Sequence, residues 1–129
     1  MNADERRSAL NAVTEKILAC AIKVSNTLGC GFLEKVYENS LAHELRRNGL
    51  TVCQQEPVRV RYEGEVVGEY LADLLVEGNV LVELKAVRAL DDIHRAQCIN
   101  YLKASGLHVC LLLNFATPRL QIQRIVNGF

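Results

Sequence analysis

The sequence predicts one α/β (α+β) domain over residues 1–129, in which a mixed β-sheet is flanked by helices. Three observations lead to this class: two helical segments open the chain, a run of short strands follows, and one more helix precedes the last strands. That order is typical of a sheet with helices packed on it. A chain of 129 residues, half of them apolar, is long enough for one domain with a proper core.

The opening helices are predicted over Ala3–Leu28 and Leu33–Asn48. Apolar residues recur at helical spacing in both segments. Gly29 and Gly31 are expected to end the first helix and Gly49 the second, because glycine readily adopts the backbone conformation that closes a helix.

The middle and end of the chain read as strands around a third helix. Pro57 should separate the first two strands, and Glu63-Gly64 is a turn signal. The third helix is expected over Asp92–Ala104, with Asp91 as its N-cap and Gly106 at its end. The predicted strands are Thr51–Gln55, Val58–Tyr62, Val66–Tyr70, Leu71–Val76, Val80–Lys85, His108–Phe115 and Leu120–Val126, the last at an edge.

Composition narrows the class of protein. The net charge is zero, with 15 basic and 15 acidic residues, which counts against a dedicated nucleic-acid coat. Neither a membrane-spanning run nor a signal peptide is recognisable, so we expect a cytoplasmic protein without a membrane partner. The five cysteines form no CxxC pair, and buried free thiols explain them better than zinc or iron–sulfur ligation.

The most informative stretch is the predicted hairpin that ends at Lys85. If Glu77–Asn79 forms a tight turn that sets Val76 opposite Val80, Asp73 falls opposite Glu83, with Cβ atoms roughly 5 Å apart. Lys85 then projects from the same face as Glu83. The opposite face is entirely apolar: Ala72, Leu74, Val76, Val80, Val82 and Leu84.

Two close carboxylates repel each other and favour a cation between them. A divalent metal held by such a pair polarises a phosphate and lowers the pKa of a bound water, which phosphodiester hydrolysis requires. The lysine could orient that water or stabilise developing negative charge. The alternative, which spacing alone leaves open, is a cross-strand ion network without a metal.

Two helical patterns fit the same site. Gln97 and Tyr101 lie four residues apart on one face of the third helix, with His94 one turn earlier. Glu34 and Tyr37 share a face of the second helix. In isolation the first pattern is more often a polar helix face than a site, and the second is more often a first-turn glutamate that stabilises the helix dipole.

The segment from Gly31 through Glu34 to Tyr37 resembles the motif of the GxxExxY proteins, a group of the PD-(D/E)XK nuclease superfamily. The resemblance runs from about Thr14 to Val126 and is closest to the branch of RecB-like and lambda-exonuclease-like nucleases. It implies a restriction-endonuclease-like core.

The resemblance also implies a metal centre. Asp73 and Glu83 would ligate Mg²⁺ or Mn²⁺, the Leu84 carbonyl would be a further ligand, and Glu34 would be a direct or outer ligand from its helix. Ala72 stands where the superfamily often has proline.

The remaining site residues follow by the same motif. Lys85 would position the nucleophilic water, and Gln97 and Tyr101 would orient site groups or contact a phosphate. Independently of the motif, six arginines are candidate phosphate contacts, although a solvated surface explains them as well: Arg46, Arg88 and Arg95 first, then Arg47, Arg59 and Arg61.

The expected function is therefore a metal-dependent nuclease acting on nucleic acid, most simply DNA. A non-catalytic scaffold or regulatory protein of the same fold, with a homo-oligomer as one form, is the alternative. The complete Asp73, Glu83 and Lys85 set favours the enzyme, and the neutral charge favours the scaffold.

Overall fold

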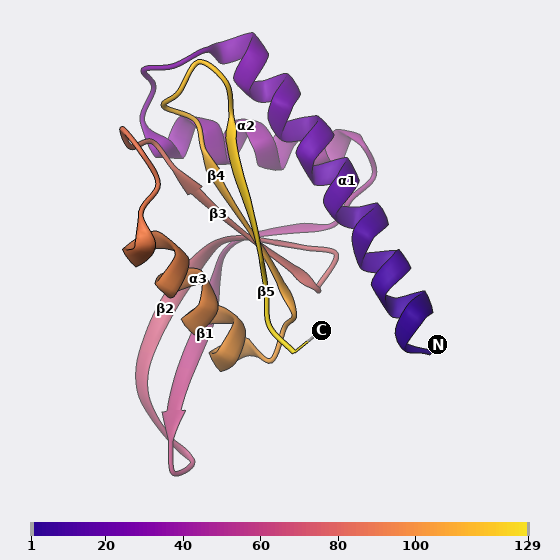
Figure 1. Ribbon diagram of the computed structural model, residues 1–129, viewed down its shortest axis with the longest axis vertical. Coiled ribbons are helices and arrows are strands. Elements are labelled where there is room, and N and C mark those ends of the chain that lie inside the picture. Colours follow the sequence, from indigo (N-terminus) through magenta and orange to yellow (C-terminus); the bar gives the residue numbers. More distant parts are fainter. Residues whose placement is uncertain (1, 129) are drawn as a thin grey trace.

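A computed structural model, which describes residues 2–128, contains three helices and a five-stranded mixed sheet of strand order β1-β2-β3-β4-β5 (Figure 1). The predicted α+β class is confirmed. The helices are α1 (Ala3–Leu28), α2 (Glu34–Arg47) and α3 (Asp92–Ser105). The strands are β1 (Val52–Tyr62), β2 (Glu65–Val76), β3 (Val80–Lys85), β4 (Val109–Asn114) and β5 (Gln121–Val126).

The sheet combines hairpins with one crossover. Strands β1, β2 and β3 pair antiparallel with their neighbours, and so do β4 and β5. Strands β3 and β4 pair in parallel, because α3 carries the chain from the end of one to the start of the other. Strand β3 therefore lies at the centre of the sheet, between a meander and a crossover unit.

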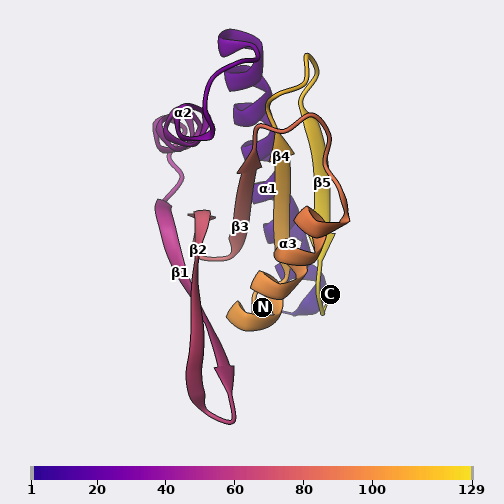
Figure 2. The ribbon, with the colours of Figure 1, turned by 90° about the vertical axis from the view of Figure 1, so that its left-hand side faces the viewer.

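Helices cover the two faces of the sheet unequally. Helices α1 and α2 pack on one face and α3 on the other (Figure 2). The larger core, under α1 and α2, includes Ile17, Leu41 and Leu111, and the smaller core, under α3, includes Leu102 and Leu112. Alternating residues of the central strands feed both cores, so both faces of β3 and β4 are buried.

The helix boundaries agree closely with the sequence prediction. Helix α1 has the predicted bounds; the Asn2 side chain accepts a hydrogen bond from the Glu5 N–H at its start, and Gly29 closes it. Helix α3 begins after Asp91, whose side chain accepts from the Ile93 N–H, and it ends at left-handed Gly106. Helix α2 is one residue shorter at each end than expected.

Two strand predictions are wrong in detail. Pro57 does not separate two strands, because β1 is continuous through it. An edge strand tolerates proline, since one side of its backbone has no partner. Ala72 packs with the core under α3 and not with Leu74. Strict alternation fails because the β1–β2 ladder is interrupted next to Ala72, where Gln55 has a left-handed φ of 56°.

The two turns between the first three strands lie where the sequence indicates. Glu63 and Gly64 both have positive φ, as a two-residue hairpin loop between twisted strands requires. The second turn, Glu77–Asn79, sets Val76 opposite Val80. No helix within residues 2–128 is long and apolar enough to cross a membrane.

Candidate active site

The strands β2 and β3 part where Asp73 faces Glu83. The backbone ladder pairs Val76 with Val80 and the next two residues along, which is the predicted register. Beyond these pairs, carboxylate oxygens accept backbone N–H groups in place of backbone carbonyls. The Asp73 N–H donates to Glu83 Oε1 at 3.0 Å, and the Leu84 N–H donates to Asp73 Oδ2 at 2.8 Å. Each carboxylate is thus held by the backbone of the opposite strand, so the hairpin fixes the pair in place.

Burial keeps this pair from ionising fully. Glu83 is only 3% exposed, and burial, followed by the charge of Asp73, raises the pKa of Glu83 to about 9. Burial also raises the pKa of Asp73, and the hydrogen bond from the Leu84 N–H opposes that rise. Near neutral pH the Glu83 carboxyl therefore keeps its proton. The Asp73–Glu83 pair therefore binds a proton in a position that a cation could occupy instead.

Lys85 is the last residue of β3 and follows Glu83 by two residues, so the two side chains project from the same face. Its positive charge lowers the pKa of both Asp73 and Glu83, which opposes the effect of burial. Within residues 2–128 its amine has no hydrogen bond or ion pair. The amine therefore lies near the carboxylates without being neutralised by them.

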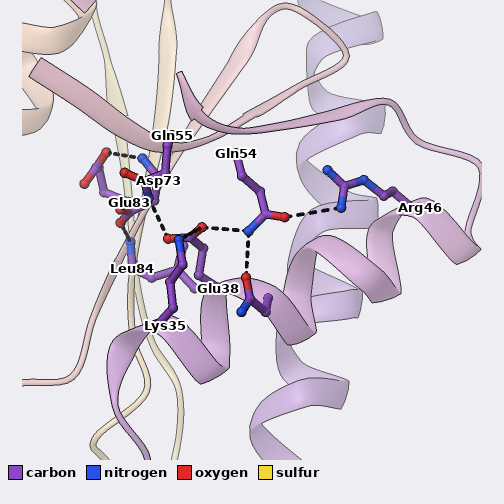
Figure 3. A network of polar contacts seen from close by, with 9 residues as sticks. Lys35, Glu38, Arg46, Gln54, Gln55, Asp73, Glu83 and Leu84 are labelled. Atoms are coloured by element: carbon purple, nitrogen blue, oxygen red, sulfur yellow. Dashed lines mark hydrogen bonds and ion pairs between the residues drawn. The ribbon is translucent and has the colours of Figure 1, made fainter. Parts of the chain in front are cut away.

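A polar network joins this pair to helix α2 through Glu38 (Figure 3). Glu38 is 4% exposed and accepts from Gln54 Nε2 and Gln55 Nε2, each at 2.7 Å, and from Lys35 Nζ at 2.9 Å. Gln55 Nε2 also approaches Asp73 Oδ1 to 3.5 Å. The Gln55 amide therefore bridges two carboxylates.

The left-handed backbone of Gln55 is part of this arrangement. Gln54 pairs with Leu74 and Glu56 pairs with Ala72, which leaves Gln55 facing Asp73 without a ladder partner. Positive φ in a non-glycine residue is strained and is often found at functional sites. Glu38 and Gln55 were not predicted from the sequence. A signal was present only for Glu38, which lies on the same helix face as Leu41 and Leu45.

The motif glutamate of α2 lies elsewhere. Glu34 is exposed in the first turn of the helix, and the α2 glutamate that contacts the site network is Glu38, one turn further on. Tyr37 is structural: its hydroxyl donates to the Gly29 carbonyl at 2.6 Å and accepts from the Phe32 N–H at 3.2 Å. Its ring also stacks on Phe115, with centroids 4.7 Å apart. The motif tyrosine fixes the α1–α2 loop.

Helix α3 faces the carboxylates from the other side. Gln97 Nε2 donates to the Tyr101 hydroxyl at 3.1 Å, as their spacing predicts. Burial, followed by the charges of Glu83 and Asp73, raises the pKa of Tyr101 to about 12. His94 is a capping residue, because its Nδ1 accepts from the Asp91 N–H at 3.1 Å.

The first three candidate arginines lie on separate parts of the molecule. Arg46 of α2 donates to the Val52 carbonyl at 2.9 Å, and Arg95 of α3 donates to Gln123 at 3.0 Å across the opposite face of the sheet. Arg88 is exposed in the loop after β3. All five cysteines are free; Cys20, Cys98 and Cys110 are buried, whereas Cys30 and Cys53 are exposed, contrary to a uniformly buried set.

The donor set suits a hard cation that keeps most of its own water. Among residues 2–128, no three acidic, histidine or cysteine side chains converge closely enough to form a metal cage. Mg²⁺ is commonly held by one or two carboxylates, with waters and substrate phosphates as its other ligands. Glu83 Oε2 and Asp73 Oδ1 accept no backbone hydrogen bond in the described chain, and Asp73 Oδ1 has only the 3.5 Å approach of Gln55 Nε2, so these two oxygens are the ones that could face a cation.

Comparison with known proteins identifies the superfamily of the chain. Residues 11–125 match the model of the PD-(D/E)XK nuclease superfamily, and the chain belongs to that superfamily. Proteins of this superfamily are usually dependent on divalent metals. No curated protein matches the chain.

A solved structure titled "Crystal structure of SSO0001" shares the fold, with a TM-score of 0.55 at 16% sequence identity. The alignment covers 74% of this chain and 50% of the other, so this chain spans about half the length of that protein.

Proposed function

We propose that this protein is a metal-dependent nuclease that cleaves phosphodiester bonds, with DNA as its substrate. The observation that supports this most is the buried Asp73–Glu83 pair with an unpaired lysine beside it. Such a pair destabilises the fold unless it holds a proton or a cation, and a structural role would be served better by apolar residues. Within the superfamily, the motif of Gly31, Glu34 and Tyr37 supports placement in the GxxExxY group of the RecB-like branch.

The side chains of the site have separate proposed roles. Asp73 and Glu83 would hold Mg²⁺ or Mn²⁺ through their available oxygens, with the Leu84 carbonyl as a further ligand. The metal supplies a Lewis acid for the phosphate and a bound water of lowered pKa. The Lys85 amine orients the attacking water or stabilises negative charge on the phosphate, because nothing else in the described chain neutralises it.

Residues around the pair position these groups. The hydrogen bond from Gln97 fixes the Tyr101 hydroxyl, which is protonated near neutral pH and can donate to a bound group. Glu38 and Gln55 hold Asp73 from the α2 side. Glu34, which is exposed, would act only as an outer residue, through water or substrate.

The test compares wild type with Lys85→Ala on linear, nicked and branched DNA and on RNA, with Mn²⁺ at low salt. Wild type should cut at least one DNA substrate, and the variant should lose on the order of a hundredfold or more in rate, as for other groups that stabilise transition-state charge. Lys16→Ala is the matched control, because Lys16 is exposed on α1 and does not belong to the polar network around the carboxylate pair. If wild type cuts nothing above the Lys85→Ala background, the non-catalytic scaffold, monomeric or oligomeric, replaces the enzyme.

A further inference from the structure

The hairpin of β1 and β2 extends well beyond the body of the protein as a two-stranded arm (Figures 1 and 2). Val58 is the last buried residue of β1, and the outer part of the arm exposes large apolar and aromatic side chains. Tyr70 lies at the base of the arm and is 52% exposed. Its ring lies beside that of Tyr101 of α3, with centroids 5.7 Å apart and an interplanar angle of 41°. Tyr70 therefore marks the place where the arm meets α3.

Two adjoining hollows run along this junction. One, of roughly 260 Å³, is lined by Tyr70, Ile93, Ala96, Gln97, Asn100 and Tyr101. The other, of roughly 400 Å³, is lined by Val60, Arg61, Tyr70, Asn100, Lys103 and Ala104. Tyr70 and Asn100 line both, so the two hollows adjoin, and together they are here called the arm groove. One end of the arm groove is at Gln97 and Tyr101, beside the carboxylate pair.

The charge of the arm groove is suited to a polyanion. Arg61 and Lys103 line its outer end, and neither has an ion pair within residues 2–128. Arg59, on the same strand, is instead paired with Glu69 at 3.1 Å. No acidic side chain is among the residues that line either hollow. Two unneutralised cations facing a groove without carboxylates favour phosphate groups.

The surface beside Tyr70 is left open by a glycine. Gly68 precedes Tyr70 by two residues and pairs with Val60, so it lies on the same side of the arm as the Tyr70 ring. A Cβ added at Gly68 would meet no atom within 4 Å. Glycine weakens a strand interior and often marks a close approach by a ligand. The flank of the exposed ring is therefore free for a flat group to stack against it.

We propose that the arm groove binds a single-stranded polynucleotide, with a base stacked on Tyr70 and phosphates contacting Arg61 and Lys103. Aromatic platforms beside cations are how proteins hold unpaired strands, because every base has a face that can stack. In a duplex the bases are already stacked and paired, so Tyr70 could not reach them. This inference rests on the proposed nuclease function in one respect, namely that the bound strand leads to Asp73 and Glu83.

The first test measures binding of a dye-labelled oligothymidylate and of a blunt duplex of equal length by fluorescence anisotropy, with EDTA present to prevent cleavage. Wild type should bind the single strand more tightly than the duplex. Tyr70→Ala should weaken single-strand binding about tenfold, equivalent to about 1.4 kcal/mol. Tyr62→Ala is the matched control, because Tyr62 is 67% exposed on the same arm but lines neither hollow. Equal losses for the two variants, or equal affinity for both DNAs, would overturn the proposal.

Two further variants separate groove binding from general attraction to the surface. Gly68→Val should weaken binding by occupying the space beside Tyr70 while the fold is retained, which its melting curve checks. Lys103→Ala should reduce the slope of log affinity against log salt by about 0.7, as for one phosphate contact on a single strand. Arg59→Ala, which removes a paired cation, should change this slope less, and the opposite order would refute the role of the groove cations.

The proposed strand binding and the proposed nuclease activity can be refuted separately. A wild type that binds single strands through Tyr70 but cleaves nothing would disprove the proposed nuclease and leave the arm groove intact. A wild type that cleaves DNA while Tyr70→Ala binds normally would disprove the groove alone. If sedimentation shows a dimer that Tyr70→Ala dissociates, with no oligonucleotide bound by either protein, the groove is an interface between copies of the chain and the proposal is wrong.

Discussion

Replacing Glu83 by glutamine should stabilise the metal-free protein at alkaline pH and leave its stability unchanged in acid. The Glu83 carboxyl has a pKa of about 9 in the fold, against an ordinary value of 4.5. Between these values the unfolded chain releases the proton and the folded chain keeps it, so the free energy of unfolding falls as the pH rises. Below the lower value both states are protonated, and the side chain has no such effect.

The size of the effect follows from this difference. Each pH unit between the two values costs about 1.4 kcal/mol, so at about pH 8 the ionisation of Glu83 favours unfolding by on the order of a few kcal/mol. Glutamine is neutral at every pH, and its carbonyl can still accept the Asp73 N–H that Glu83 Oε1 accepts. For a domain of this size, about 1 kcal/mol changes Tm by roughly 3–5 °C, so Tm should rise by on the order of 10 °C.

The assay is thermal unfolding of both proteins in EDTA, at about pH 8 and near the ordinary pKa of glutamic acid. We expect Glu83→Gln to have a higher Tm than wild type at the higher pH and the same Tm at the lower pH. Glu77→Gln is the control, since Glu77 is exposed in the neighbouring turn. A loss of stability at the higher pH, or an equal gain at both, would show that the buried carboxyl is not held protonated.

Further predictions concern the other parts of the site and fold. Lys85→Ala should keep the rise in Tm that Mn²⁺ gives wild type, because the lysine does not ligate the metal, and a lost rise would contradict this division of roles. Mn²⁺ affinity should increase as the pH rises toward 9, because metal binding displaces the proton from the carboxyl pair, and calorimetry in buffers of different ionisation enthalpy should detect that proton. Tyr37→Phe should lower the free energy of unfolding by about 1–2 kcal/mol, measured with urea, because two hydrogen bonds of its hydroxyl are lost, whereas exposed Tyr62→Phe should not. Cys30 and Cys53 should react with a thiol reagent in the folded protein, and the three buried cysteines only after unfolding.

The register of the β2–β3 hairpin could be predicted from the sequence because two local signals agreed. The Glu77–Asn79 turn set Val76 opposite Val80, and the face opposite Asp73 and Glu83 carried only apolar residues. A shift of one residue would have set Asp73 opposite Val82 or Leu84 in place of Glu83. This strong constraint is why the facing of Asp73 and Glu83 followed from spacing alone.

The polar layer around Asp73 could not be predicted in the same way. Glu34 and Glu38 lie one turn apart on α2, and helical spacing alone does not show which one meets the sheet. The choice depends on Gln55, whose left-handed backbone opposite Asp73 aims its amide at Glu38. Such a local irregularity is set by tertiary contacts, and no residue-type signal marks it.

The arm was also missed, for a different reason. Proline suggested a break at Pro57, because the sequence does not indicate which strand lies at the edge of a sheet. The turn at Glu63-Gly64 predicted the hairpin, but the sequence did not indicate that it extends past the helices. The structure leaves Tyr62, Val67 and Tyr70 exposed, because the arm extends past the helices that would cover them.

The proposed nuclease requires that Asp73 and Glu83 together hold a divalent cation. Anomalous scattering from crystals soaked in Mn²⁺ tests it most directly. We expect one strong anomalous peak bonded to both carboxylates in wild type and no peak at that position in Glu83→Gln. A wild-type crystal that binds Mn²⁺ only elsewhere, such as at exposed Glu34, or a peak that persists unchanged in Glu83→Gln, would contradict it.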